Sequence, residues 1–228
     1  MTGFLLLAVI ILAVSLVKRG TLDIPDHLNP WAPLRIEEPP HAFTRIKLRR
    51  LSRNAELCLA TLRYADMTFE PLEDRDTGLG CGFRNAVRIT ATSAAVGEPF
   101  SLSCPAAISL ALWERHVLQP SAQQEFGANV ARLEHFGSYA CRPIYGREGG
   151  RLSRHATADA LDLAGIVLED GSRIRILGDW DGEDAESRFL RQIHEGACRF
   201  FDAVLGPEYN EAHRDHFHFD RGAARICR

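Results

Sequence analysis

Two short stretches of this 228-residue chain concentrate side chains that bind metal ions. Residues 153–162 have the sequence SRHATADALD, and residues 212–220 have the sequence AHRDHFHFD. These side chains are the carboxylate of Asp162 and the imidazoles of His155, His213, His216 and His218. Imidazole nitrogens and carboxylate oxygens are ligands of zinc in proteins. We therefore predict that the two stretches are the two halves of one metal site.

The second stretch is predicted to form the last strand of the fold, over residues 214–220. Side chains alternate along a strand, so His216 and His218 are expected to point to one face. Phe217 and Phe219 then point to the opposite face, where two large aromatic side chains indicate a packed core. The remaining histidine of this stretch falls in the turn that enters the strand.

The first stretch leads into another predicted strand, residues 160–168, and places a carboxylate near its beginning. Asp162 stands among apolar residues, and a buried carboxylate without a partner is costly. His155 lies in the loop just before this strand. A catalytic zinc site has three protein ligands and one open position for water. His155, Asp162 and one histidine of the final strand fit that pattern.

The chemistry expected of such a site is hydrolysis. Two imidazoles and one carboxylate leave zinc with net positive charge, which polarises a carbonyl and lowers the pKa of a bound water. A nearby histidine can accept the water's proton and deliver it to a leaving amine. Arg142 precedes a glycine-rich loop and is a candidate to bind an anionic part of the substrate. Ser153 is expected to cap a turn or hydrogen-bond a ligand, since no G-x-S-x-G motif marks a nucleophile.

The elements that must position these residues predict an α+β fold with a mainly antiparallel sheet and flanking helices. We expect helices over residues 42–66 (with a break or cap at Asn54), 104–120, 121–126 and 184–205. Strands are expected at 87–90 and 100–103 around a turn at 97–99, and at 129–136, 160–168, 173–177 and 214–220. Asp170-Gly171 between two strand patterns predicts a hairpin.

Composition and charge narrow the class of protein. Hydrophobic residues make up 46% and charged residues 25% of the chain, as in a globular domain. A net charge of -3 argues against nucleic acid as a partner. The six cysteines include no C-x-x-C pair, so a zinc ribbon is not predicted; they favour disulfides in an oxidising compartment, with the pairing left open. They are Cys58, Cys81, Cys104, Cys141, Cys198 and Cys227.

The N-terminal segment is uncharged and apolar over residues 3–17. As a helix it would be about 22 Å long, against a hydrocarbon core of about 30 Å. We expect residues 1–19 to be an uncleaved membrane anchor; a cleaved signal peptide is the alternative, but no A-x-A site is present. Lys18 and Arg19 favour a cytoplasmic position for the C-terminal side of this helix. The cysteines favour the opposite, so we expect attachment to the inner membrane and a domain in the periplasm.

A proline-rich segment comes directly after this anchor. Residues 20–41 contain five prolines, which disfavour a helix and predict an extended spacer. Its apolar residues offer the alternative that it packs on the domain. The domain itself is expected to span residues 42–228.

The motif S-x-H-x-x-G-x-A-x-D followed by H-x-H resembles the LAS-type zinc metallopeptidases, which include D-Ala-D-Ala carboxypeptidases and murein endopeptidases. Ala158 stands where that group usually has glycine. More narrowly, the chain resembles the bacterial extensin-like C-terminal domain family over roughly residues 55–228. The residues that carry this resemblance are C-G-F at 81–83, S-x-S-C-P at 101–105 and S-Y-x-C-R at 138–142.

The resemblance implies a LAS/hedgehog-type metallopeptidase fold and a set of roles. It implies that His155, Asp162 and His218 bind zinc. It implies that His216 is the catalytic histidine, with His213 as the second candidate. Arg142 is implied to bind a carboxylate of the substrate. The implied activity is zinc-dependent hydrolysis of a peptide bond in peptidoglycan, of the D,D-carboxypeptidase or endopeptidase type. The alternative is a non-catalytic protein that binds a cell-wall peptide or supports the envelope, with a retained or vestigial zinc site.

Overall fold

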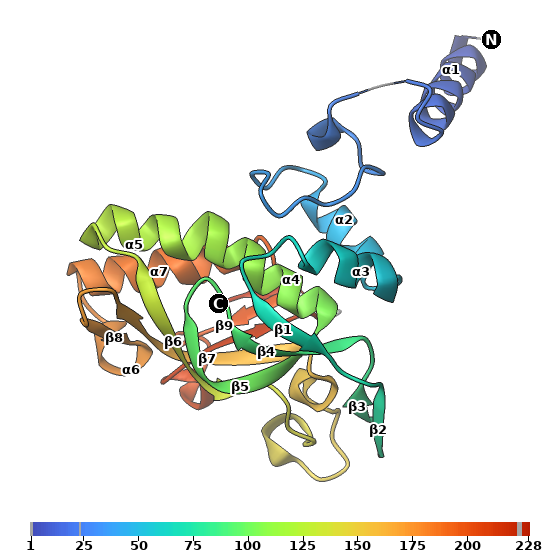
Figure 1. Ribbon diagram of the computed structural model, residues 1–228. Coiled ribbons are helices and arrows are strands. Elements are labelled where there is room, and N and C mark those ends of the chain that lie inside the picture. The colour runs from blue at the N-terminus through green and yellow to red at the C-terminus, as the bar shows by residue number, and fades with distance from the viewer. Residues whose placement is uncertain (1, 23, 223–224) are drawn as a thin grey trace.

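A nine-stranded mixed sheet forms the centre of the computed structural model, which describes residues 2–22, 24–222 and 225–228 (Figure 1). The strand order is β1-β4-β5-β6-β7-β10-β9-β11, and β8 pairs with β7. These strands are β1 (Thr68–Pro71), β4 (Ala86–Ala91), β5 (Ala95–Ser103), β6 (Val130–Gly137), β7 (Ala160–Leu168), β8 (Arg173–Arg175), β9 (Ala203–Leu205), β10 (Phe217–Asp220) and β11 (Ile226–Cys227). A separate hairpin joins β2 (Arg75–Gly78) and β3 (Cys81–Phe83).

The α+β class is confirmed, but the sheet is mixed and not purely antiparallel. β5 pairs with β6 in parallel, and β9 pairs with β11 in parallel. Both parallel pairs have a long connection between their strands, which a parallel arrangement requires. Helices fill the first connection, and β10 lies within the second.

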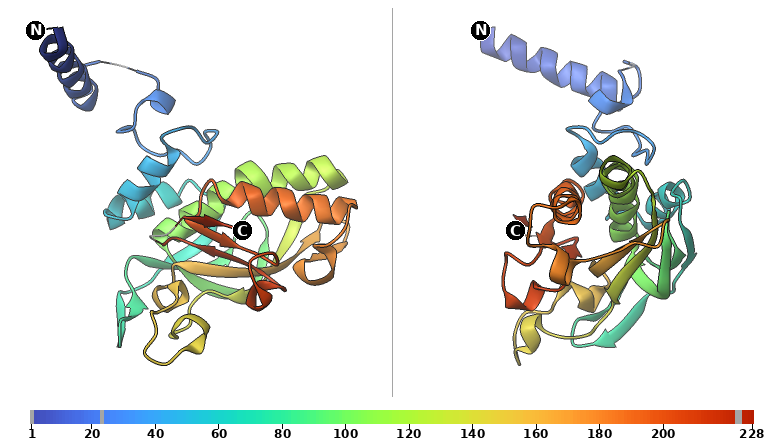
Figure 2. Two further views of the ribbon diagram at one scale, coloured as in Figure 1. Left: turned by 180° about the vertical axis from the view of Figure 1, so that it is seen from behind. Right: turned by 90° about the vertical axis from the view of Figure 1, so that its left-hand side faces the viewer.

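Helices cover one face of this sheet, while the loops that carry the predicted site lie on the other (Figures 1 and 2). The covering helices are α4 (Cys104–Trp113), α5 (Gln119–Phe126) and α7 (Ala185–Ala197). Trp113 donates its indole N–H to the carbonyl of Ile193, which ties α4 to α7. The ring of Trp113 lies 5.2 Å from that of Phe219, so the helical layer packs directly on β10.

The helix that begins at Cys104 does not end at Pro120 as predicted. A π-helical turn, Glu114–Leu118, links α4 to α5, and the backbone N–H of Gln119 bonds to the carbonyl of Glu114. This wider turn shifts the hydrogen-bond pattern just ahead of the proline, which has no N–H of its own to donate. The chain therefore remains helical to Phe126.

Two other predicted helices have different bounds. The segment 42–66 forms α2 (Thr44–Leu51) and α3 (Ala55–Leu62), and Asn54 caps α3 by accepting from the N–H of Leu57. The predicted helix 184–205 ends at Ala197, because residues 203–205 form β9 between β10 and β11.

The predicted strands are closer to the structure. Residues 160–168 form β7 as predicted, and the Asp170-Gly171 hairpin leads to a return strand that is shorter than expected. The turn between β4 and β5 lies at residues 92–94, so the prediction of a turn at 97–99 is wrong. The final strand begins at Phe217, because residues 214 and 215 belong to the preceding turn.

The N-terminal segment forms α1 (Thr2–Lys18), a helix of 17 residues. Within the described ranges, no helix is both long enough and apolar enough to cross a membrane. The proline-rich segment is not wholly detached from the domain, because Leu34 and Ile36 are buried in the main core.

All six cysteines are paired. The disulfides are Cys58–Cys104, Cys81–Cys141 and Cys198–Cys227. The first joins α3 to the start of α4, the second joins β3 to the segment after β6, and the third joins the end of α7 to β11. The prediction of disulfides is thus confirmed, and the structure supplies the pairing that the sequence left open.

The Cys58–Cys104 bridge is expected to contribute strongly to stability because it closes a separation of 46 residues. Chain entropy gives a loss of about 4 kcal/mol in the free energy of unfolding when both cysteines are changed to serine. Urea unfolding of the double variant beside the oxidised wild type measures this loss. Peptide mapping without reduction must recover the same pair from the wild type; another partner for Cys58 would contradict the assignment.

Glu114, the first residue of the π-helical turn, is a buried carboxyl group at 2% exposure. Its Oε2 atom accepts hydrogen bonds from the backbone N–H and the hydroxyl of Ser93. Burial raises the pKa of Glu114 to about 7, against the lowering effect of hydrogen bonds from Ser93 and Thr92. A carboxyl whose pKa is higher in the folded than in the unfolded chain favours folding at low pH.

This stabilisation is fully present below pH 4.5 and is lost as the pH rises through 7. Glu114→Gln removes the titrating group. We expect the free energy of unfolding of the wild type, relative to that variant, to fall by about 3 kcal/mol between pH 4.5 and pH 8.5. Urea unfolding of both proteins across this range measures the difference. A difference that stays constant with pH would show that Glu114 is not the titrating group.

Candidate metal centre

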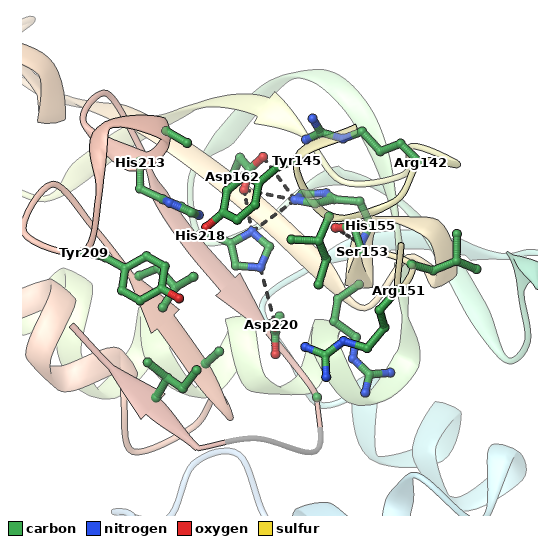
Figure 3. Close-up of a pocket in the computed structure, with 18 of the residues that line it drawn as sticks. Arg142, Tyr145, Arg151, Ser153, His155, Asp162, Tyr209, His213, His218 and Asp220 are labelled. Atoms are coloured by element: carbon green, nitrogen blue, oxygen red, sulfur yellow. Dashed lines mark hydrogen bonds and ion pairs between the residues drawn. The ribbon is translucent and has the colours of Figure 1, made fainter. Parts of the chain in front are cut away.

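Three buried side chains from separate elements converge at one point on the loop-covered face of the sheet (Figure 3). His155 lies on a 3-10 turn, Arg154–Thr157; Asp162 lies on β7, and His218 lies on β10. One ligand atom from each lies within 4.8 Å of the other two. β10 pairs with β7 so that His218 stands opposite Asp162. The structure therefore brings together the three residues that the sequence singled out as metal ligands.

The turn that carries His155 is fixed at both ends. Ser153 caps it by accepting a hydrogen bond from the N–H of His155 at 3.3 Å. Ala158 ends it in the left-handed region, with φ of 54°. Glycine is the residue best suited to that conformation. Position 158 is where this chain departs from the glycine of the S-x-H-x-x-G-x-A-x-D motif. The backbone at this position is nevertheless in the left-handed conformation that glycine adopts most readily, and Ala158 adopts it here.

Hydrogen bonds at the outer nitrogens decide which nitrogen of each histidine carries the proton when the ring is neutral. The Nδ1–H of His155 donates to the carbonyl of Ser138 at 2.7 Å, and a carbonyl only accepts. Its Nε2 therefore directs a lone pair inward. The Nε2 of His218 lies 3.3 Å from Oδ2 of Asp220, to which it donates, so its Nδ1 faces inward. Such outer partners orient metal-binding histidines.

The inward atoms are spaced as metal ligands are. Nε2 of His155 lies 3.1 Å from Oδ1 of Asp162 and 3.1 Å from Nδ1 of His218. Nδ1 of His218 lies 2.8 Å from Oδ1 of Asp162. Ligand atoms on a tetrahedral zinc ion stand about 3.3 Å apart, so small shifts would accommodate the ion. Two imidazole nitrogens and a carboxylate oxygen are a donor set that fits zinc.

The electrostatics at this point favour a cation. Burial raises the pKa of Asp162, but hydrogen bonds and positive charge from His155 and His218 in their protonated forms outweigh burial and hold that pKa well below its usual range. Burial lowers the pKa of His218, but Asp162 and Asp220 outweigh burial and raise it to about 9. The two carboxylates thus stabilise positive charge between them, and a proton on His218 competes with a metal ion for the same position.

Two further histidines lie beside this cluster. The Nδ1–H of His216 donates to Oδ1 of Asp215 at 2.9 Å, and its Nε2 lies 3.5 Å from Oδ1 of Asp162. The Nδ1–H of His213 donates to the amide oxygen of Asn210 at 2.8 Å. The ring centroid of His213 is 5.3 Å from that of His216. Both residues named by the sequence as proton carriers therefore stand next to the cluster.

These two histidines differ in their partners. Burial, followed by the charges of His218 and His216, lowers the pKa of His213 to about 4. His213 is therefore neutral near pH 7 and bound to an amide. His216 is bound to the carboxylate of Asp215, which stabilises an imidazolium ion when one forms.

The cluster lies in a pocket of about 530 Å³. Arg142, Arg151 and Arg154 all line it, which makes it attractive to anionic groups. Figure 3 shows Arg142 and Arg151 on the opposite side of the cluster from His213 and Tyr209. Arg142 is exposed, and it begins a loop closed by the bond from the N–H of Ser153 to its carbonyl.

Several residues of the site were not identified from the sequence. Asp220 lies two positions after His218 on the same strand, so alternation places both on one face and would have identified it. Tyr145 and Asn210 come from loops without periodicity, and Nδ2 of Asn210 donates to the hydroxyl of Tyr145 at 2.8 Å. No sequence signal connects these two loops.

Comparison with curated proteins and with solved structures finds no match. A family model described as extensin-like protein C-terminus matches residues 56–228, which include every residue of the cluster and the pocket around it. That match covers most of the chain, and with it this chain belongs to the family of extensin-like protein C-terminal domains.

Proposed function

We propose that this protein is a zinc-dependent hydrolase that cleaves a peptide bond in peptidoglycan, as a D,D-carboxypeptidase or an endopeptidase. One observation carries the proposal: His155, Asp162 and His218 direct three acceptor atoms at a single point beside two further histidines. The resemblance of the two motifs to LAS-type metallopeptidases supports the reaction class. This resemblance to the metallopeptidases rests on those two motifs alone.

His155, Asp162 and His218 would hold the ion, with Ser138 and Asp220 keeping the two imidazoles in place. When bound, zinc would polarise the scissile carbonyl and lower the pKa of the attacking water. Burial of the three ligands keeps the reaction in a region of low dielectric, where such interactions are strong.

We assign proton transfer to His216. Its Nε2 lies beside Asp162, so it can take the proton of the attacking water and deliver it to the leaving amine. Asp215 on the far nitrogen supports the charged ring in between. His213 is neutral and keeps its Nδ1–H on Asn210, so its other nitrogen can accept a hydrogen bond from a substrate N–H.

Substrate class and location belong to the same proposal. Peptidoglycan peptides carry free carboxylates, and the arginines around the pocket, Arg142 foremost, would bind one of them. Three disulfides support an oxidising compartment, which is the periplasm in our proposal. The exposed apolar side chains of α1 support attachment of that segment to the inner membrane.

Zinc content tests the metal site directly. The full chain, purified in mild detergent, is expected to contain about one zinc ion per chain, as a site with three protein ligands predicts. His218→Ala should lose the ion. Asp220→Asn should weaken zinc affinity by roughly 10- to 100-fold, because His218 loses its orienting carboxylate. Asp170→Asn, in the exposed hairpin turn, is the matched control and should bind as the wild type does. A wild-type protein without zinc affinity would refute the site.

Digestion of purified muropeptides tests the reaction. His216→Ala is expected to retain zinc and to lower kcat by roughly 10²- to 10⁴-fold, the range for loss of a general acid–base group. His213→Ala should lower the rate less, because that residue only accepts a hydrogen bond. His27→Ala, an exposed histidine before α2, is the control. Zinc-loaded wild type that binds muropeptides and leaves them intact would favour the peptide-binding or structural alternative.

A further inference from the structure

Three arginines line the pocket around the metal cluster: Arg142, Arg151 and Arg154. Within the described part of the chain, none of the three takes part in an ion pair. The carboxylates that line the same pocket in those residues are Asp162 and Asp220, and both are bonded to histidines of the cluster. The pocket wall therefore carries positive charge that no described side chain neutralises.

The loop that carries Arg142 and Arg151 folds back on itself as a short hairpin. The N–H of Ser153 donates to the carbonyl of Arg142, and the N–H of Ile144 donates to the carbonyl of Arg151. An isolated antiparallel bridge lies between these two hydrogen bonds. Residues opposite each other in such a pair share a face, as do residues two apart along one strand. Both arginines therefore lie on the same face of the hairpin, and that face lines the pocket.

Contacts at both ends hold this hairpin in place. At its base, Cys141 is bonded to Cys81 of β3. At its tip, the hydroxyl of Tyr145 accepts a hydrogen bond at 2.8 Å from Nδ2 of Asn210, which belongs to the segment before β10. The backbone that carries the two arginines is thus tied to the rest of the domain on both sides. An arginine on a fixed backbone loses less conformational entropy when it binds an anion.

The two arginines occupy different parts of the pocket wall. Figure 3 shows Arg142 above His155 and Arg151 below Ser153. A guanidinium group presents a planar fork of N–H donors that matches one carboxylate. Two guanidinium groups on either side of the cluster therefore match two carboxylates better than one shared anion.

We propose that this pocket selects a peptide with two free carboxylates, one bound by Arg142 and the other by Arg151. Arg154 adds positive charge to the same wall. This inference deepens the proposed function, on which it rests for the peptide nature of the ligand. It makes the pair of arginines the determinant of substrate choice, whereas the reaction itself depends on the metal cluster.

Ligand-observed NMR with the zinc-loaded full chain tests this selectivity with three matched probes. N-acetyl-D-glutamate carries two carboxylates, whereas its monoamides N-acetyl-D-glutamine and N-acetyl-D-isoglutamine carry one each. The dicarboxylate is expected to bind roughly tenfold more tightly than either amide, because its second carboxylate gains charge-assisted hydrogen bonds.

Arg142→Gln and Arg151→Gln should each abolish this preference, because each leaves one guanidinium group on the hairpin. Binding of N-acetyl-D-glutamate should weaken roughly tenfold, to the level of the amides. Arg147→Gln is the matched control, since Arg147 is exposed in the same loop but does not line the pocket. That variant should keep the full preference.

Removal of zinc by a chelator should leave the preference unchanged, since both carboxylates bind to arginines. A preference that disappears with the zinc would place one carboxylate on the metal and overturn the proposal. Equal binding of the three probes by the wild type would overturn it too, as would a preference that survives Arg151→Gln. Selective binding without cleavage of muropeptides would refute the proposed reaction alone, and cleavage without selective binding would refute this inference alone.

Discussion

The antiparallel pairing of β10 with β7 is the interaction on which the rest of the site depends. Its register places His218 opposite Asp162. Side chains at opposite positions of such a pair are close enough for their functional groups to meet. A slip of one residue would turn His218 to the other face of the sheet. Phe217 and Phe219 prevent that slip, because both are fully buried against the helical layer.

One face of β10 therefore packs in the core, and its other face lines the site. The ring of Phe219 packs against Trp113 of α4, and the ring of Phe217 packs against His194 of α7 and against Trp180. Pocket residues occupy the alternate positions, so apolar packing on one face sets the positions of the pocket side chains on the other. The helices cover the opposite face of the sheet, and by this packing they help to hold His155, Asp162 and His218 close together. A site of this kind is preorganised by the fold.

Local sequence patterns were sufficient to predict part of this architecture. The strand that carries Asp162 was predictable because its apolar run ends at an Asp-Gly turn, and alternation alone assigned His218 and Phe219 to opposite faces. The segment 203–205 was mistaken for helix because its apolar residues continue the spacing of α7. Its strand conformation comes from pairing with β10 and β11, elements that lie later in the chain. Tyr145 and Asn210 meet through two loops, and loop contacts of that kind leave no period in a sequence.

The short motifs that carried the family resemblance acquire a physical reason from the structure. Cys81 is bonded to Cys141, so C-G-F and S-Y-x-C-R are joined covalently. The middle glycine of C-G-F is required there, because a Cβ atom would stand 2.0 Å from the carbonyl oxygen of Arg75. Ser138, the first residue of S-Y-x-C-R, supplies the carbonyl that fixes His155.

The third motif, S-x-S-C-P, supports the same turn from the other side. The hydroxyl of Ser103 donates to Asp159 at 2.6 Å, and its N–H donates to the carbonyl of Ala158. Cys104 then anchors this junction to α3 through its disulfide. All three motifs thus act on the position of His155, and the three proposed metal ligands lie outside them. The three motifs therefore indicate a turn that is held in one place. A proposed metal ligand at the end of a short loop, such as His155, needs that support.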